Sequence, residues 1–179
     1  RINKIYPRVI GDSDAEYSQK FTYDVSKIEP TVAKPYSPSN ISTARELQGT
    51  EIDKAYIGSC TGAKLEDLRV AARILKGKKV KVRTEILPAA QSIFKSALKE
   101  GLVEIFMDSG AVVGPPTCGA CCGAHMGVLG KGEVCISTTN RNFPGRMGDV
   151  QSKTFLASPK VVAASAVSGT ITDPRDLTN

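Results

Sequence analysis

The fold is decided by the stretch from Ile52 to Gly77, which reads IDKAYIGSCTGAKLEDLRVAARILKG. It opens with a short apolar run, Ala55-Tyr56-Ile57, of the kind that forms a buried strand. Apolar residues then recur at helical spacing until Gly77 ends the pattern, at Leu65, Leu68, Ala72 and Leu75. A turn that contains Cys60 joins the two patterns. The stretch therefore predicts one strand-helix unit of an α/β fold.

Strand and helix patterns continue to alternate through the rest of the chain. Further strands are predicted at 80–86, 102–106 and 133–137, and further helices at 88–101 and 161–167. Helix 88–101 is expected to open at Pro88 and to end at Gly101, while helix 161–167 follows Pro159. We predict an α/β domain over residues 51–179, a three-layer sandwich with an open, mainly parallel sheet.

The first 50 residues have a different character. They contain four prolines and few helical patterns, and only Phe21 to Val25 alternates as a short strand would. We predict an extended leader over residues 1–50, a kind of segment that commonly wraps over a neighbouring domain. The first residue is Arg1 and not Met, which indicates that the sequence begins within a longer chain.

Composition excludes several classes of protein. With 179 residues and 41% hydrophobic content, the chain can bury a real core. No apolar window approaches the length of a membrane span and no signal peptide is visible, so we expect a soluble, cytoplasmic protein. The net charge of +6 comes from Lys and Arg interleaved with Asp and Glu. An anionic small molecule or an acidic partner surface fits this pattern better than nucleic acid.

The chain has five cysteines, an odd number, and three of them lie within five residues at Cys118, Cys121 and Cys122. This clustering indicates metal or redox chemistry instead of a disulfide framework. The pair Cys118 and Cys121, together with the remote Cys60, supplies three thiolates among small residues. Ordinary electron-transfer iron-sulfur clusters take four, so three would leave one iron open as a Lewis acid.

Other interpretations of these residues remain open. A Cys-x-x-Cys pair also suits a redox disulfide or half of a zinc site. Cys122 is poorly placed to chelate together with its neighbour, and it could be a redox partner or filler. Cys135 lies in a strand-like segment and is predicted to be a buried small hydrophobe. His125, the single histidine, could be a ligand, a hydrogen-bond donor or a structural imidazole.

The loop after the predicted strand 133–137 carries Asn140, Arg141 and Arg146. Guanidinium groups bind planar anions through two parallel hydrogen bonds, so the loop suits a carboxylate or a phosphate. Taken alone, it could also be a surface loop with solvated arginines. Because the carboxyl ends of parallel strands share one edge of the sheet, this loop and the cysteines should meet there. A metal centre beside an anion clamp indicates a substrate that is both chelated and anionic.

Short segments throughout the domain carry a resemblance to a known family. They are IGSCT at 57–61, LEDLR at 65–69, LKEGL at 98–102, CGAC at 118–121, HMGV at 125–128, NRNF at 140–143 and GR at 145–146. From about Ile52 to Arg175 the chain resembles the third domain of the aconitase superfamily. The resemblance is to the branch that contains the large subunits of 3-isopropylmalate dehydratase and homoaconitase, and the leader is similar too.

The resemblance implies a hydro-lyase that moves a hydroxyl group on a hydroxy di- or tricarboxylic acid such as isopropylmalate, in leucine biosynthesis. It implies a 4Fe-4S cluster held by Cys60, Cys118 and Cys121. Arg141 and Arg146 would bind the substrate carboxylate, and Asn140 would form a hydrogen bond at the cluster. The alternative is a zinc-binding or redox-switch thiol module without catalysis.

Two departures from the family and one larger gap accompany this resemblance. The family usually has Asn where this sequence has Gly62, and Leu where it has Cys122. Members of the family also carry two further N-terminal domains, and a small swivelling subunit that supplies the base and more substrate contacts. The expected partners are therefore those domains and that subunit. The chain alone is predicted to be inactive.

Overall fold

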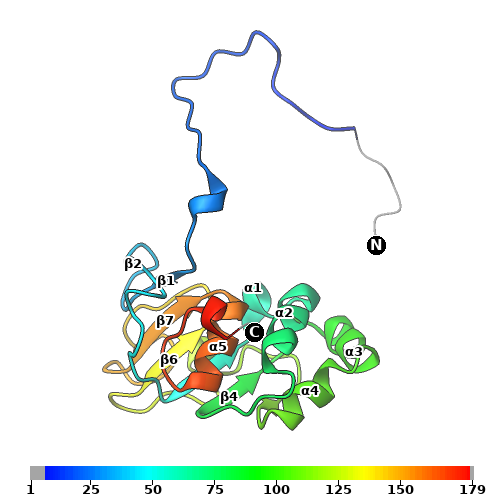
Figure 1. The fold of residues 1–179 in the computed structure, drawn as a ribbon, viewed down its shortest axis with the longest axis vertical. Helices are drawn as coiled ribbons and strands as arrows, with labels where there is room; N and C mark the ends of the chain where they lie inside the picture. Colours follow the sequence, from blue (N-terminus) through cyan, green and yellow to red (C-terminus); the bar gives the residue numbers. More distant parts are fainter. Residues whose placement is uncertain (1–6, 178–179) are drawn as a thin grey trace.

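The computed structural model describes residues 7–177, which contain a seven-stranded sheet with helices packed against it (Figure 1). The strands are β1 (Thr31–Ala33), β2 (Ile41–Thr43), β3 (Lys54–Ile57), β4 (Arg83–Ile86), β5 (Val112–Val113), β6 (Val134–Ser137) and β7 (Lys153–Ala157). The α-helices are α1 (Ser59–Gly62), α2 (Leu65–Leu75), α3 (Gln91–Lys99), α4 (Leu102–Asp108) and α5 (Pro159–Ser168). Short 3₁₀ turns occur at η1 (Val25–Lys27), η2 (Gly119–Cys122) and η3 (Pro174–Asp176).

The sheet is mainly parallel, as the sequence predicts. Its strand order is β2-β1-β7-β6-β3-β4-β5, and β7 through β5 all pair in parallel. Only β1, next to the edge strand β2, runs antiparallel to its neighbours β2 and β7. The carboxyl ends of β3, β5 and β6 therefore point the same way, which brings the loops that follow them to one edge of the sheet.

One face of the sheet is covered by helices. In β3, Ala55 and Ile57 point to this face, where they join the main apolar core with Leu68 of α2 and Val162 of α5. Helix α5 packs on both α2 and β3. It begins where expected, because Pro159 occupies the first turn and the Ser158 hydroxyl accepts a hydrogen bond from the Val161 N–H.

The opposite face of the sheet is covered mostly by two loops. Tyr56 of β3 points to this face and packs with Leu87, Leu129, Met147 and other residues in a second, smaller apolar cluster. The first covering loop is residues 114–132, here called the thiol loop, which follows β5. The second is residues 138–148, here called the arginine loop, which follows β6. All the cysteines except Cys60 and Cys135 lie in the thiol loop.

The predicted leader differs along its length. Residues 7–29 are exposed and run away from the sheet (Figure 1). By contrast, β1 and β2 lie before residue 50 yet are hydrogen-bonded to the sheet through β7. Residues 1–6 lie outside the described residues. The domain boundary near residue 50 stays a prediction.

Two predicted strands are wrong. Residues 102–106 form the start of α4, in which Leu102 and Phe106 are both buried on one side, four residues apart. A short apolar run fits a buried strand or a buried helical turn equally well, so its periodicity could not separate the two. The predicted strand Phe21 to Val25 is exposed and pairs with no strand among the described residues. An unpaired strand is not stable alone.

Other elements are correct in type but differ in extent. Helix α3 begins at Gln91 and not at Pro88, and β4 begins at Arg83 and not at Val80. The strands β1, β2, β5 and β7 were not predicted. The predicted strand 133–137 and the helices 65–75 and 161–167 are confirmed, to within two residues at their ends.

Candidate functional site

Cys60 lies in α1, directly after β3, and its segment is tied to the arginine loop. The Gly58 N–H donates to the Thr138 hydroxyl oxygen at 2.9 Å, and the Thr138 hydroxyl donates to the Gly58 carbonyl at 3.1 Å. A side chain at Gly62 would collide with Thr138. In this chain Gly62 therefore permits the close approach of the two segments, which gives its departure from the family pattern a local reason. The Cys60 thiol itself is exposed.

The thiol loop is held against β3 at its first cysteine. The Tyr56 hydroxyl donates to the Cys118 carbonyl oxygen at 2.8 Å. The next residue, Gly119, has φ +51°, and a Cβ there would lie 3.2 Å from the Tyr56 hydroxyl and closer still to Leu87. Cys118 and Cys122 are exposed, whereas Cys121 is buried. The loop thus presents two thiols to solvent and one inward.

Arg146 brings the arginine loop to the buried thiol. Its Nη2 lies 3.7 Å from the Cys121 Sγ. Burial raises the pKa of the Cys121 thiol, while the Arg146 guanidinium acts in the opposite direction by hydrogen bonding and charge. Within the described chain, the buried Arg146 Nε has no hydrogen-bond partner. The side chain that contacts the Cys121 sulfur therefore has an N–H donor, at Nε, that no described residue uses.

The rest of the arginine loop is anchored through Asn142. Its Nδ2 donates to the Lys34 carbonyl at 2.8 Å and to the Thr154 carbonyl at 3.2 Å, which fixes the loop to the segment after β1 and to β7. Asn140 and Arg141 are exposed. Two of the predicted substrate-binding residues therefore face solvent from an anchored loop, and the third, Arg146, contacts the Cys121 thiol.

The structure brings Cys118, Cys121 and Cys122 to one region, next to Tyr56, but not into a closed coordination group. The charges of Cys118, Cys121 and Cys122 are near enough to act on Tyr56, whose pKa is raised by burial first and by these thiols as well. Among residues 7–177, no three His, Cys, Asp or Glu side chains converge closely enough to hold a metal ion. Cys60 lies on a segment that is hydrogen-bonded to the arginine loop through Gly58 and Thr138.

The structure also places the two remaining candidates, His125 and Cys135. The His125 Nε2 lies 2.9 Å from the Thr117 hydroxyl oxygen, a hydrogen bond between two residues of the same loop. Cys135 is fully buried in β6, which confirms the prediction of a buried small residue. Burial raises its pKa to about 12.

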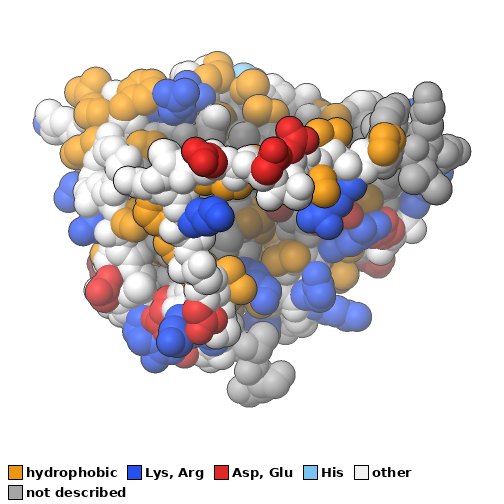
Figure 2. Space-filling view, turned by 90° about the horizontal axis from the view of Figure 1, so that it is seen from above, with side chains coloured by type: hydrophobic (Ala, Val, Ile, Leu, Met, Phe, Trp, Pro, Cys, Tyr) orange, Lys and Arg blue, Asp and Glu red, His pale blue; other side chains and the backbone are white. Residues whose placement is uncertain are grey.

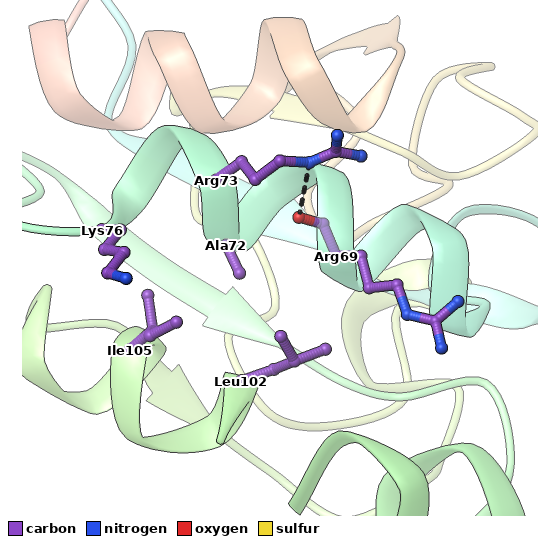
Figure 3. Close-up of a pocket in the computed structure, with 6 residues that line it drawn as sticks. All are labelled: Arg69, Ala72, Arg73, Lys76, Leu102 and Ile105. Carbon is purple, nitrogen blue, oxygen red and sulfur yellow. Dashed lines mark hydrogen bonds between the residues drawn. The ribbon is translucent and has the colours of Figure 1, made fainter. Parts of the chain in front are cut away.

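A cavity lies away from the cysteines, on the helix-covered side of the molecule. It is an open hollow of about 440 Å³ between α2 and α4 (Figure 3). The residues that line it are Arg69, Ala72, Arg73, Lys76, Leu102 and Ile105. The Arg69 guanidinium is already paired with Glu100 and Glu66. The hollow contains no cysteine, so its size does not mark the predicted chemistry.

One face of the molecule fits the interleaved charge pattern of the sequence. Figure 2 shows a face on which basic, acidic and apolar side chains are mixed, without a continuous basic surface. No helix in the described part of the chain is long and apolar enough to cross a membrane.

Two residues of β3 were missed as site residues by the sequence analysis. Tyr56 supports Cys118, and Lys54 is fully buried beneath the thiol loop. A signal for Lys54 was present, because a lysine stands directly before the apolar run that was predicted to form a buried strand.

Thiols, glycines and arginines gathered at the carboxyl edge of a parallel sheet are what the family resemblance predicts for an aconitase-type domain. The model of the "Aconitase family (aconitate hydratase)" matches residues 40–169, and the chain belongs to this family.

Curated relatives are similar over nearly the whole chain. A protein of Clostridium kluyveri named 3-isopropylmalate dehydratase large subunit is 55% identical over 177 residues, 98% of this chain and 42% of its own length. Proteins of the same name from Hydrogenobaculum sp. and Aquifex aeolicus are 52% and 54% identical, over 99% and 93% of this chain. The chain spans 42% and 40% of those two relatives.

Proposed function

We propose that this chain is the cluster-bearing part of a hydro-lyase large subunit. The enzyme would move a hydroxyl group on a hydroxy di- or tricarboxylic acid such as isopropylmalate, in leucine biosynthesis. The observation that carries the proposal is the contact between Arg146 and Cys121, because it places a guanidinium group, which is suited to bind a carboxylate, beside a thiol of the kind that binds iron-sulfur clusters. The names of the relatives favour the same reaction class.

Cys60, Cys118 and Cys121 would hold a 4Fe-4S cluster. The donor set fits chemically, since iron-sulfur clusters take thiolates and two of these thiols are exposed at the same sheet edge. Side chains are excluded at Gly62 and Gly119 by close neighbours, so the backbone beside the thiols stays bare. When bound, the cluster would supply an iron with an open coordination position that acts as a Lewis acid.

The chain's own residues would bind and orient the substrate. Arg146 is half-buried, and its Nε is free to donate to a carboxylate that enters beside Cys121. Arg141 is exposed on the same loop and can approach a second carboxylate oxygen. Asn140 offers an exposed amide donor next to it. Asn142 holds the loop that carries all three of these residues.

The rest of the enzyme would come from elsewhere. The chain spans about two fifths of the length of its relatives, whose name, large subunit, implies a smaller partner. We infer that the N-terminal domains and the small subunit complete the active site, in the cytoplasm. The isolated chain should then bind a cluster yet show no turnover.

The test is anaerobic reconstitution of the chain with iron and sulfide, followed by iron and sulfide counts and absorbance near 400 nm. We expect about four irons per chain, as in a 4Fe-4S cluster. Cys60→Ser should lose most of this iron. Cys122→Ser removes an exposed thiol that is not assigned as a ligand and should keep it.

A colourless protein that holds one zinc ion would overturn the cluster and favour the thiol-module alternative. Turnover by the isolated chain without partners would contradict the division of the active site between chains. Equal iron loss in Cys60→Ser and Cys122→Ser would refute the assignment of ligands.

A further inference from the structure

Lys54 is an unusual residue for its position. It lies in β3, the central strand of a parallel sheet, and its side chain is fully buried. Lysines are almost never fully buried unless their charge is paired, because an unpaired ammonium group loses its hydration. A lysine here therefore needs a specific arrangement of partners.

The partners of Lys54 lie on β4 and on the thiol loop. Its ammonium group forms an ion pair with Glu85 of β4, with Nζ and Oε2 2.7 Å apart. The same Nζ donates to the carbonyl oxygen of Gly127. Gly127 has φ +74°, and a Cβ there would overlap both Lys54 and Glu85. The backbone of the thiol loop thus rests directly on the buried ion pair.

Tyr56 holds the other end of the same loop. It is the next residue of β3 on this face, and Lys54 Nζ lies 5.6 Å from the centre of its ring. Its buried hydroxyl donates to the Cys118 carbonyl. The segment from Cys118 to Gly127, which contains the thiols of Cys121 and Cys122, is therefore fixed at both ends by two residues of one strand.

We propose that Lys54 and Tyr56 are positioning residues that hold the Cys118 and Cys121 thiols at the spacing needed to bind one thiophilic group. This inference rests on the proposed function only for the identity of the group that the thiols bind, an iron-sulfur cluster. Lys54 acts through Gly127, with Glu85 as its counter-ion, and Tyr56 acts through Cys118. Neither residue needs to touch the bound group. Removing either contact, Lys54 to Gly127 or Tyr56 to Cys118, widens the range of distances between the two sulfur atoms.

The experiment measures the affinity of the two thiols for phenylarsine oxide. This arsenical condenses with two neighbouring thiols, forms two As–S bonds and releases one water without a redox change. The background is Cys60→Ser with Cys122→Ser, which leaves Cys118, Cys121 and the buried Cys135. Competition with a small dithiol gives the equilibrium constant, and no iron is present, so the result is independent of the cluster.

Three variants are compared in this background. Tyr56→Phe keeps the ring and removes the hydroxyl. Lys54→Met with Glu85→Leu removes the whole ion pair, a replacement that often leaves stability near that of the parent. Lys131→Met is the matched control, because Lys131 is an exposed lysine of the same loop.

We expect Tyr56→Phe and the double variant each to bind the arsenical about tenfold more weakly, while the double variant unfolds near the parent midpoint. Lys131→Met should bind like the parent. Unchanged arsenical affinity in Tyr56→Phe, or in a folded double variant, would overturn the proposal. If the double variant does not fold, Tyr56→Phe alone decides. If iron binding fails but these differences hold, the proposed function is wrong and the positioning role stands.

Discussion

The two faces of the sheet belong to the same strands but are covered through different kinds of interaction. On the helix-covered face, Ala55 and Ile57 meet α2 and α5 in a large apolar core. On the loop-covered face, Lys54 and Tyr56 meet the thiol loop through hydrogen bonds, above a Lys54–Glu85 ion pair within the sheet and beside a small apolar cluster. Apolar packing has no direction and stabilises the whole domain. Hydrogen bonds are directional and fix single groups, which is what a site needs.

The largest effect is expected on the helix-covered face. Leu68 is fully buried in the main core, so Leu68→Ala should lower the free energy of unfolding by about 3 kcal/mol through lost burial and a cavity. Denaturant unfolding followed by circular dichroism measures this. Leu98→Ala is the matched control, because Leu98 is 53% exposed, and it should change stability by less than about 0.5 kcal/mol. Equal losses of unfolding free energy in Leu68→Ala and Leu98→Ala would mean that the main core does not dominate stability.

A smaller and more local effect is expected on the loop-covered face. Leu129 is 2% exposed in the small cluster. Its backbone hydrogen bonds to Met147 and to Asp149 tie the thiol loop to the end of the arginine loop and to the residue that follows it. Leu129→Ala should let the thiol loop open without unfolding the domain, raising amide exchange at Cys121 and Gly123 by about thirtyfold.

The readout for Leu129→Ala is hydrogen exchange by mass spectrometry, with the amides of α2 as the internal reference. Those amides should change far less than the loop amides. Similar acceleration of amide exchange in the thiol loop and in α2 would contradict a difference between the two faces, because they would then unfold as one cooperative unit.

The smallest effect concerns pH and Cys135. Its pKa is raised by burial from 9.0 to about 12, so the folded protein keeps this proton where the unfolded chain loses it. The stability that depends on this proton is complete below pH 9 and is lost as pH rises toward 12. The stability advantage of the parent over Cys135→Ala should thus shrink by about 1 kcal/mol between pH 8 and pH 10. Urea unfolding of the parent and of Cys135→Ala at both pH values measures this change. A stability difference that stays the same at pH 8 and pH 10 would mean that the Cys135 thiol is hydrated in the folded protein.

Local patterns predicted the parts of the fold whose partners lie nearby in the sequence. The strand-helix unit from Ile52 to Gly77 is confirmed because its apolar spacing and its stop signal agree. The position of Cys60 after β3 follows from the same pattern. The apolar run 102–106 was misassigned because it is too short to distinguish a strand from a helix.

The edge strands and the residues beneath the thiol loop needed the tertiary structure. β1 and β2 are only three residues each. β1 pairs with β7, more than a hundred residues away, and β2 pairs with β1. Lys54 is explained only by Glu85 and Gly127, which approach it from distant segments. No local pattern contains such partners.

The sequence by itself determined the class of fold, the family and the residue types that carry chemistry, because periodicity and motif spacing are local properties of the chain. Only the tertiary structure decided which face the thiols occupy and that Arg146 meets Cys121. It also decided that a buried ion pair and the Tyr56 hydroxyl hold the thiol loop. The physical reason is that the energy of a buried charge or a directed hydrogen bond depends on where its partner lies in space, and chain order does not specify that position.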